Sequence, residues 1–451
     1  MQLEQKSLNA FLEAVKKLDG GFAALPDFSA TPYDESRLLE VLQATAERLR
    51  DNYPYFHPLY AGQMLKPPHP IARLAYALAM WINPNNHALD GGRATSAMEK
   101  EAVAEIASMF GWNNFLGHLC GGGTMANLEA LWVAGQLYPG KKVLASAQAH
   151  YTHQRISSVL NLEFESVPVD SQARMNIDGL RKRLQRGDIG TVVATMGTTA
   201  TGSVDPLPEI LALRDKFAFC IHADAAYGGY FGLVDNLAAS AKSAFARIGE
   251  VDSIVVDPHK HGLQPYGCGC VLFRDPNVGS LYKHDSPYTY FSSAELHLGE
   301  ISLECSRPGA SAAALWATQK LLPLAKHGEF AQRLERSRSA ALALYEKARS
   351  DDRFLTAFAP ELDIVVFAPR AADISEVSAR SRAIFAAAAE RGLHLALADL
   401  PVSFFPFPTT VQRDRKTITC LRSVLMKPEH LDWVDRIWQI LASATGASQN
   451  P

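Results

Sequence analysis

The segment "VDPHKHGLQP", residues 256–265, places Lys260 between two histidines directly after a strand-like run. The β-branched residues at 254–256 are typical of a buried strand. A lysine at the end of such a strand is unfavourable unless it is paired or has a chemical task. The alternative is a lysine in an ordinary surface loop. The segment therefore predicts a buried strand and raises the question of what its lysine does.

The surrounding sequence repeats the pattern of a helix followed by a short apolar strand, from about residue 96 to residue 275. Each expected strand is nearly continuous in apolar residues, as burial on both faces requires. The strand-like segments are "KVLASA", "FESVPV", "GTVVATM", "AFCIHA", "DSIVVD" and "CGCVLF". The alternation predicts an α/β fold in which helices cover both faces of a mainly parallel sheet.

The chain is expected to form more than one domain, because its 451 residues exceed what one core usually supports. Residues 71–325 carry the strand–helix alternation and are predicted to form a large domain. A long charged helix, followed by a few strands and helices, predicts a small C-terminal α+β domain over residues 326–451. Residues 1–70 lack the alternation and are interpreted as an arm that packs on a partner subunit.

The composition limits the classes of partner. The formal net charge of −3 gives no reason to expect nucleic acid or a membrane as partner, and no apolar run is long enough for a membrane span. The charged, helix-patterned start is unlike a cleaved signal peptide. Six scattered cysteines suggest reduced thiols and a cytoplasmic setting. Cys268 and Cys270 lack a second pair at zinc-site spacing, so no metal is expected.

A glycine run precedes one of the expected helices, in "CGGGTMANLEAL" at 120–131. In an open α/β sheet, ligands bind beyond the carboxyl ends of the strands. Gly123 permits close backbone approach there, and Thr124 with the free amides of the helix start is suited to bind a phosphate. The alternative is a loop in which Thr124 caps the helix.

A carboxylate follows another expected strand, in "IHADAAYGGYF" at 221–231. Asp224 stands between a hydrophobic run and two alanines, where a carboxylate is unfavourable unless it is paired. A cationic ring nitrogen would compensate its charge, and the small Ala226 would leave room for a flat ring. The alternative is an aspartate that caps a turn.

Two histidines follow a third strand, in "SAQAHYTHQRI" at 146–156. His150 and His153 could be taken as a metal pair, but no third ligand stands at suitable spacing. His150 is better placed to stack its ring on a planar cofactor.

These features together match the contacts that pyridoxal phosphate requires. They are a phosphate-binding loop, a stacking ring, a buried carboxylate for the pyridine nitrogen, and a lysine whose amine condenses with the aldehyde. Each is weak alone, but they occur together in this order on a parallel sheet. The sequence therefore predicts pyridoxal 5'-phosphate as the cofactor, with Lys260 as the lysine that holds it.

The motifs "GGT…N", "AH", "HADAAYGG" and "DPHK", in this order, resemble the group II pyridoxal-phosphate decarboxylases. Members of that group act on aromatic amino acids, tyrosine, glutamate, aspartate and relatives. The resemblance runs from about "YAGQMLKPPHPIARL" to "CLRSVLMKPEH". It implies the aspartate-aminotransferase-like fold, also called fold type I, with a large seven-stranded-type sheet. It also implies a homodimer with its sites at the subunit interface.

The resemblance also assigns roles to single residues of the cofactor site. Phosphate contacts, ring contacts and the attachment point are expected at Gly123, Thr124, His150, Thr198, Asp224, Ala226, His259 and Lys260. His259 would help to hold the phosphate, and Thr198 would lie near the ring hydroxyl. Asp257 is a departure, because relatives have asparagine or serine near this place and a carboxylate repels phosphate. Asp257 and His261 are left without a role.

The same resemblance indicates where the substrate binds and how a proton reaches it. Tyr288 is expected to be the proton donor on a mobile loop, with Tyr290 as the reserve, and Arg422 is a candidate for a substrate carboxylate or for a structural ion pair. The side-chain pocket is expected to be lined by Tyr60, His87 and Leu89.

The expected activity is decarboxylation of an L-amino acid, with an aromatic one such as tyrosine favoured. One group of alternatives uses the same cofactor: oxidative decarboxylation with deamination, decarboxylation of aspartate or glutamate, or carbon–carbon bond cleavage. The other alternative is a catalytically silent dimer of the same fold.

Overall fold

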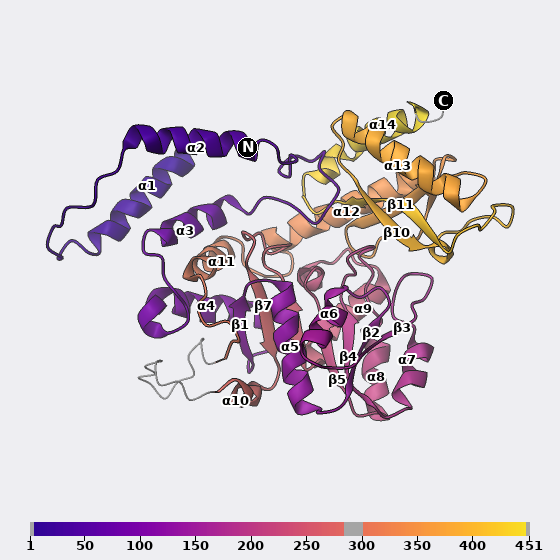
Figure 1. The fold of residues 1–451 in the computed structure, drawn as a ribbon, viewed down its shortest axis with the longest axis horizontal. Helices are drawn as coiled ribbons and strands as arrows, with labels where there is room; N and C mark the ends of the chain where they lie inside the picture. The colour runs from indigo at the N-terminus through magenta and orange to yellow at the C-terminus, as the bar shows by residue number, and fades with distance from the viewer. Residues whose placement is uncertain (1–3, 284–300, 448–451) are drawn as a thin grey trace.

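The computed structural model describes residues 4–283 and 301–447. Figure 1 shows a large body built on one sheet, a smaller body formed by the carboxyl-terminal part of the chain, and two N-terminal helices that project away from the large body.

The large sheet has seven strands in the order β1-β7-β6-β5-β4-β2-β3. The strands β2 to β6 pair in parallel with one another, whereas β7 is antiparallel to both β1 and β6. The predicted α/β fold with a mainly parallel sheet is therefore confirmed. The bounds are β1 (Leu116–Cys120), β2 (Lys142–Ser146), β3 (Phe164–Val167), β4 (Ile189–Thr195), β5 (Cys220–Asp224), β6 (Ser253–Val256) and β7 (Gly269–Phe273).

The strand β6 shows why the sequence needs a continuous apolar run. Ile254 and Val256 belong to one core cluster and Val255 to another, and all three are fully buried. Because successive side chains of a strand point to opposite faces, both faces of the sheet are covered. The helices of the large body are α4 (Leu89–Met109), α5 (Gly123–Leu137), α6 (Thr152–Val159), α7 (Ile177–Leu184), α8 (Leu207–Ala212), α9 (Ala239–Ala246), α10 (Gly279–Tyr282) and α11 (Gly309–Leu321).

The smaller body contains a four-stranded antiparallel sheet in the order β10-β11-β9-β8. Its helices α12 and α13 pack on the sheet, and α14 packs on both of them, at the upper right of Figure 1. The bounds are β8 (Phe354–Thr356), β9 (Ile364–Pro369), β10 (Ala396–Pro401), β11 (Thr417–Val424), α12 (Glu329–Arg349), α13 (Ile374–Glu390) and α14 (His430–Ala447).

The first helices, α1 (Gln5–Gly20) and α2 (Glu35–Leu49), contain no buried residue. In Figure 1 they form a hairpin that touches the rest of the chain mainly where α1 meets α3 (Pro70–Met80). Among the helices of the described ranges, none is both long and apolar enough to cross a membrane.

The segment that follows this hairpin is tied to the small sheet. The amide of Ala61 donates to the carbonyl of His394, and the amide of Val424 donates to the carbonyl of Ala61. The ammonium of Lys427 donates to the carbonyl of Tyr60 over 2.7 Å. The N-terminal segment therefore lies along the small sheet before the chain enters the large body.

A close backbone approach positions the turn after β5. A Cβ built on Gly228 would lie 1.8 Å from the carbonyl oxygen of Met196, at the end of β4. Only glycine allows the two loops to touch, and their contact sets the position of Ala226 and Tyr227 one or two residues earlier.

We therefore expect Gly228→Ala to lower the free energy of unfolding by about 3 kcal/mol or more, because the backbone must move to admit the methyl group. Gly446→Ala is the matched control, since a Cβ on Gly446 in α14 meets no atom within 4 Å. It should leave stability unchanged or raise it by up to about 1 kcal/mol. Urea unfolding followed by circular dichroism measures both, and equal stabilities of the two variants would contradict the expectation.

Candidate cofactor site

A cavity of about 530 Å³ lies at the carboxyl ends of β4, β5 and β6, beside the first turn of α5. Its volume is in the range of small-molecule sites. It brings together seven of the residues predicted to contact the cofactor, from four separate parts of the sequence. They are Gly123, Thr124, His150, Asp224, Ala226, His259 and Lys260.

Asp224, the last residue of β5, borders the cavity and is 5% exposed. Its Oδ2 lies 2.8 Å from Nε2 of His153, and its Oδ1 accepts from the amide of Ala226 over 3.2 Å. Burial by itself would raise the pKa of Asp224, but the hydrogen bond and charge of His153 outweigh it and hold this pKa well below its usual value. Asp224 therefore caps its turn and also presents an ionised carboxylate to the cavity.

His150 lies just before α6, with its ring at the cavity wall. Its Nδ1 is 2.7 Å from the hydroxyl of Thr152. Burial lowers the pKa of His150, which favours the uncharged ring that stacks most readily on a flat aromatic ligand. Within the described ranges no group of three or more potential metal ligands is present.

Lys260 also borders the cavity, and its Nζ lies 2.8 Å from Oδ2 of Asp257. This ion pair explains why a carboxylate stands in the segment "DPHK", since Asp257 is 1% exposed and needs a cationic partner. The Nε2 of His259 lies 3.6 Å from the same oxygen, and its Nδ1 is 2.8 Å from the carbonyl of Cys268. Because that carbonyl can only accept, Nδ1 is the donor.

The glycine loop packs closely against these polar groups. Gly122 has a φ of +137°, which favours glycine, and a Cβ there would lie 3.1 Å from the His259 ring. A Cβ on Gly123 would lie 2.6 Å from a carboxylate oxygen of Asp257. The helix α5 begins at Gly123 without a side-chain cap, so Thr124 is not the capping residue that was considered as an alternative.

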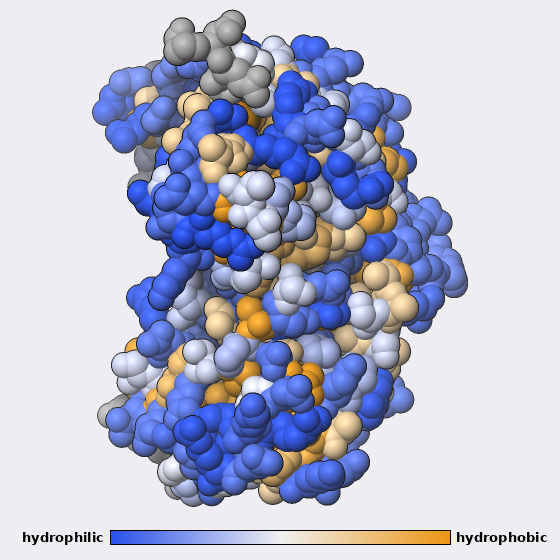
Figure 2. Space-filling model, turned by 90° about the vertical axis from the view of Figure 1, so that its right-hand side faces the viewer, coloured by the Kyte–Doolittle hydropathy of each residue, from blue (hydrophilic) through white to orange (hydrophobic). Residues whose placement is uncertain are grey.

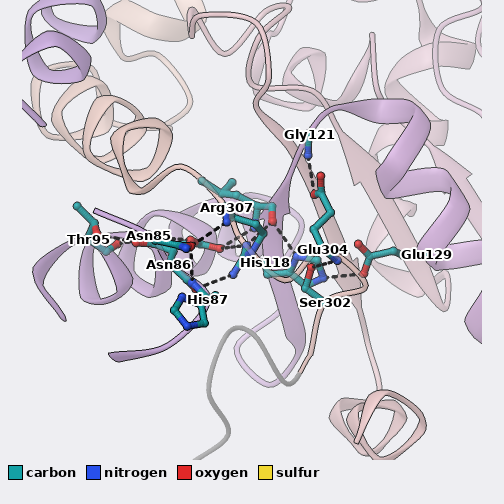
Figure 3. A network of polar contacts seen from close by, with 12 residues as sticks. Asn85, Asn86, His87, Thr95, His118, Gly121, Glu129, Ser302, Glu304 and Arg307 are labelled. Atoms are coloured by element: carbon teal, nitrogen blue, oxygen red, sulfur yellow. Dashed lines mark hydrogen bonds and ion pairs between the residues drawn. The ribbon is translucent and has the colours of Figure 1, made fainter. Parts of the chain in front are cut away.

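A network of polar contacts holds the glycine loop from below (Figure 3). The amide of Gly121 donates to Glu304 over 2.9 Å. Arg307, three residues later, donates to Glu99 over 2.7 Å and to the carbonyl of Leu119 in β1. Since Arg307 and Glu99 are both buried, this ion pair fixes the 301–308 segment against the end of β1.

These features fit pyridoxal phosphate. The amides at the start of α5 can receive a phosphate, and the Cβ atoms that glycine lacks would fill that space. The ionised Asp224 suits a protonated pyridine nitrogen, and the amine of Lys260 reaches the same cavity.

Thr198 lies beside the cavity and is not among the residues that line it. Its hydroxyl is 2.7 Å from that of Thr201 and accepts from the amide of Ser203, so it closes its own loop. Thr195 and Thr199 line the cavity in its place. The spacing of the sequence did not distinguish Thr198 from its neighbour because both threonines belong to one tight turn.

The residues predicted to bind the substrate are not brought into the cavity lining. Tyr60 is 5% exposed and packs near Tyr53, Tyr55 and His394 at the edge of the small sheet.

His87 lies close to Gly91, at the network of Figure 3, and is absent from the lining. Leu89 begins α4, but its side chain lies outside what the structure describes. Tyr288 and Tyr290 fall within residues 284–300, also outside the described residues.

Arg422 of β11 is 4% exposed and joins three parts of the chain. Its guanidinium donates to the carbonyls of Thr199 and Ala200 over 2.6 and 3.0 Å, and to Oε1 of Gln63 over 3.1 Å. These contacts correspond to the structural role considered for Arg422, although the partners are carbonyl and amide oxygens and not carboxylates. Through Thr199, Arg422 positions the cavity wall.

Besides the lining threonines, sequence reasoning missed two residues that hold parts of the site in place. His153 was considered only as a metal ligand, although its spacing of three residues from His150 puts both on one side of a helix start. No sequence pattern pointed to Glu304, because its partner Gly121 is 183 residues away.

The strand order, the glycine loop and the lysine beyond β6 define a class of fold, the pyridoxal-phosphate enzymes of fold type I. Oryza sativa TDC with PLP and tryptamine has a similar structure over 100% of both chains, with a TM-score of 0.78 and 18% identity. Mouse CSAD in apo form is similar over 97% of this chain and 99% of that one, with a TM-score of 0.76 and 18% identity.

The profile of the family described as pyridoxal-dependent decarboxylase conserved domain matches residues 133–370, more than half of the chain. The chain belongs to this family, so the predicted family and cofactor are confirmed.

Two relatives illustrate the similarity. L-tyrosine decarboxylase of Enterococcus faecium is 29% identical, over 66% of this chain and 65% of that enzyme. A probable L-tyrosine/L-aspartate decarboxylase of Methanoculleus marisnigri is 32% identical, over 58% of this chain and 69% of that protein. The chain thus spans just under two thirds of the length of the Enterococcus faecium enzyme.

The buried His222 of β5 gives a prediction on acid stability. Burial lowers the pKa of His222 to about 3. In the unfolded chain a histidine titrates near pH 6.5, so unfolding takes up a proton between these values and stability falls as the pH is lowered.

We expect His222→Gln, which keeps polar groups for Asn127 and Ser253, to remove this part of the acid sensitivity. Between pH 7 and pH 5 the wild type should lose about 2 kcal/mol more unfolding free energy than the variant. Urea unfolding at both pH values measures the difference. Parallel losses in the two proteins would show that His222 is not the group responsible.

Proposed function

We propose that this chain is a pyridoxal-phosphate-dependent decarboxylase that converts an L-amino acid to its amine and carbon dioxide. The observation that carries the proposal is the cavity at the strand ends, where Lys260, Asp224 and His150 meet beside the glycine loop. Membership of the pyridoxal-dependent decarboxylase family supports it. The presence of all three side chains in one cavity argues against a catalytically silent dimer.

When bound, pyridoxal phosphate supplies an electron sink that weakens the bonds to the substrate α-carbon. Lys260 would hold the aldehyde end of the cofactor, and Asp224 would bind its pyridine nitrogen as a charged hydrogen-bond acceptor. His150 and Ala226, which both line the cavity, would pack against the ring. Gly123, Thr124 and His259 would contact the phosphate, while Thr199 borders the cavity in the place expected for Thr198.

The preferred substrate is an aromatic amino acid, with tyrosine first. The similar curated proteins are named for L-tyrosine or for L-tyrosine and L-aspartate, which makes aspartate the second candidate. Met125 and Leu128 add apolar surface to the cavity wall, which suits an aromatic side chain better than a carboxylate. Loss of carbon dioxide leaves a position on the α-carbon that a proton must fill, and Tyr288 is proposed as its donor.

Lys260→Ala tests the attachment point. The wild-type protein incubated with pyridoxal phosphate and reduced with borohydride should gain the cofactor mass on the peptide containing Lys260. The variant should lose this modification and at least about a thousandfold of the amine-forming rate, because the attaching amine is gone. Amine and carbon dioxide are measured by mass spectrometry on a mixture of the common amino acids.

Tyramine with an equal amount of carbon dioxide is the expected product. A keto acid as the main product, or oxygen consumption with ammonia release, would show that the protein catalyses another reaction with the same cofactor. A wild-type protein that binds no cofactor would contradict the proposal as a whole.

We also propose that the protein is a homodimer in which α1 and α2 pack on the partner subunit. Neither helix contains a fully buried residue in the single chain, although both carry large apolar side chains. The exposed apolar residues of this region include Phe22, Leu25, Phe28, Leu38, Leu39, Leu42 and Leu49. The face in Figure 2, on the other side of the molecule, is largely hydrophilic with scattered hydrophobic residues.

Such an apolar surface on a free monomer is unfavourable, which supports an interface there. Light scattering of the full chain should give twice the mass of 49.2 kDa. Leu39→Glu together with Leu42→Glu should shift the measured mass toward that of the monomer. The matched control, Glu40→Gln on the same helix, should leave the mass unchanged, and a dimer unaffected by the leucine changes would place the interface elsewhere.

We further propose a reducing compartment, the cytoplasm, because the six cysteines are all free thiols.

A further inference from the structure

The histidine that contacts Asp224 has no role in the function proposed so far. His153 lies on the first turn of α6, and its Nε2 is 2.8 Å from Oδ2 of Asp224 across 71 residues of sequence. The side chain of His153 is fully buried and that of Asp224 is 6% exposed. Since a carboxylate can only accept, Nε2 is the donor.

The contact is the main polar anchor of this carboxylate. Apart from His153, Asp224 accepts only the amide of Ala226, over a longer distance of 3.2 Å, among the hydrogen bonds of the described residues. His222 and Lys260 act on it only through charge, without a hydrogen bond to it among the described residues. Without His153, a buried carboxylate would keep one backbone hydrogen bond, which compensates its desolvation poorly.

The ring of His153 is not shared with another polar group. Its Nδ1 is buried and has no hydrogen-bond partner within the described part of the chain. The ring of the buried His222 lies close to it, with centroids 6.4 Å apart. His222 makes its own contacts with Asn127 and Ser253 and none with Asp224. Within these ranges, the only polar contact of the His153 side chain is therefore the one to Asp224.

We propose that His153 is a positioning residue that fixes the carboxylate of Asp224 as an anion facing the cavity, and that cofactor affinity depends on this contact. The inference rests on the proposed role of Asp224 as the partner of the pyridine nitrogen. His150 and His153, three residues apart, then have different roles. His150 contacts the cofactor, and His153 acts only through Asp224.

Cofactor affinity tests the proposal without any assay of turnover. His153→Leu removes the donor at similar volume, whereas His153→Gln keeps an N–H group near the position of Nε2. Each full-length protein is stripped of cofactor and titrated with pyridoxal phosphate, and absorbance gives the dissociation constant. We expect His153→Leu to weaken binding about 10- to 100-fold, the range found when an outer partner of a metal-ligating residue is lost. His153→Gln should stay within about threefold of the wild type.

A double-mutant cycle separates positioning from general damage to the fold. In the background of Asp224→Asn, His153→Leu should change the dissociation constant by less than about threefold, because its target is already gone. His222→Gln is the matched control, a buried histidine of the same strand region that does not touch Asp224. It should leave cofactor affinity within about threefold, whatever its effect on stability.

The pH dependence of the bound cofactor's absorbance gives an independent readout. The spectrum should change with pH in His153→Leu over a range where the wild-type spectrum is constant, since the ring nitrogen loses its fixed anion. Melting temperatures of the cofactor-free proteins identify any variant that is unfolded. If His153→Leu is unfolded, the cofactor affinity of His153→Gln relative to the wild type is the test of the proposal.

The outcomes distinguish this inference from the proposed function. Wild type that binds cofactor through Lys260, with His153→Leu binding equally well, would overturn the role of His153 alone. Equal losses from His153→Leu in the wild-type and Asp224→Asn backgrounds would also overturn it, because the effect would not pass through Asp224. Wild type that binds no cofactor would instead contradict the function proposed for the cavity.

Discussion

The charge of Asp224 is the constraint on which the site depends. A carboxylate 5% exposed at the end of a central strand would take up a proton or move unless other groups compensated its burial. His153, the amide of Ala226 and the charge of Lys260 supply that compensation from three different segments. The parallel sheet makes this possible, because it brings the carboxyl ends of β4, β5 and β6 to one edge. The cavity lies at that edge of the sheet.

The small sheet contributes to the site without lining it. Arg422 of β11 holds the carbonyl of Thr199, and Thr199 forms part of the cavity wall. Asp363, just before β9, accepts from the hydroxyl of Tyr227 over 2.5 Å, and Tyr227 also borders the cavity. Burial raises the pKa of Asp363 to about 6. The two bodies therefore share a polar junction directly behind the cofactor cavity, and the position of one limits the shape of the other.

The sequence predicted the fold and seven of the residues that line the cavity, because both follow from local patterns. Continuous apolar runs indicate doubly buried strands, and polar residues that follow them, such as Asp224 and Lys260, meet at one edge. What it could not predict depends on partners distant in sequence. Glu304 contacts Gly121 across 183 residues, and Arg422 meets Thr199 across 223. The choice between Thr198 and Thr199 depends on the path of one turn, which residue types do not specify.

The attachment of residues 59–63 to the small sheet has a consequence for how the chain assembles. Arg422 contacts Gly62, and Lys66 contacts the carbonyl of Met426, each across 360 residues of sequence. During synthesis, nearly the whole chain must therefore be made before the residues that contact this N-terminal segment exist. Contacts of such long range form slowly and leave apolar surface uncovered meanwhile. Residues 59–66 are thus exposed to aggregation, or to chaperones, until the last strand is made.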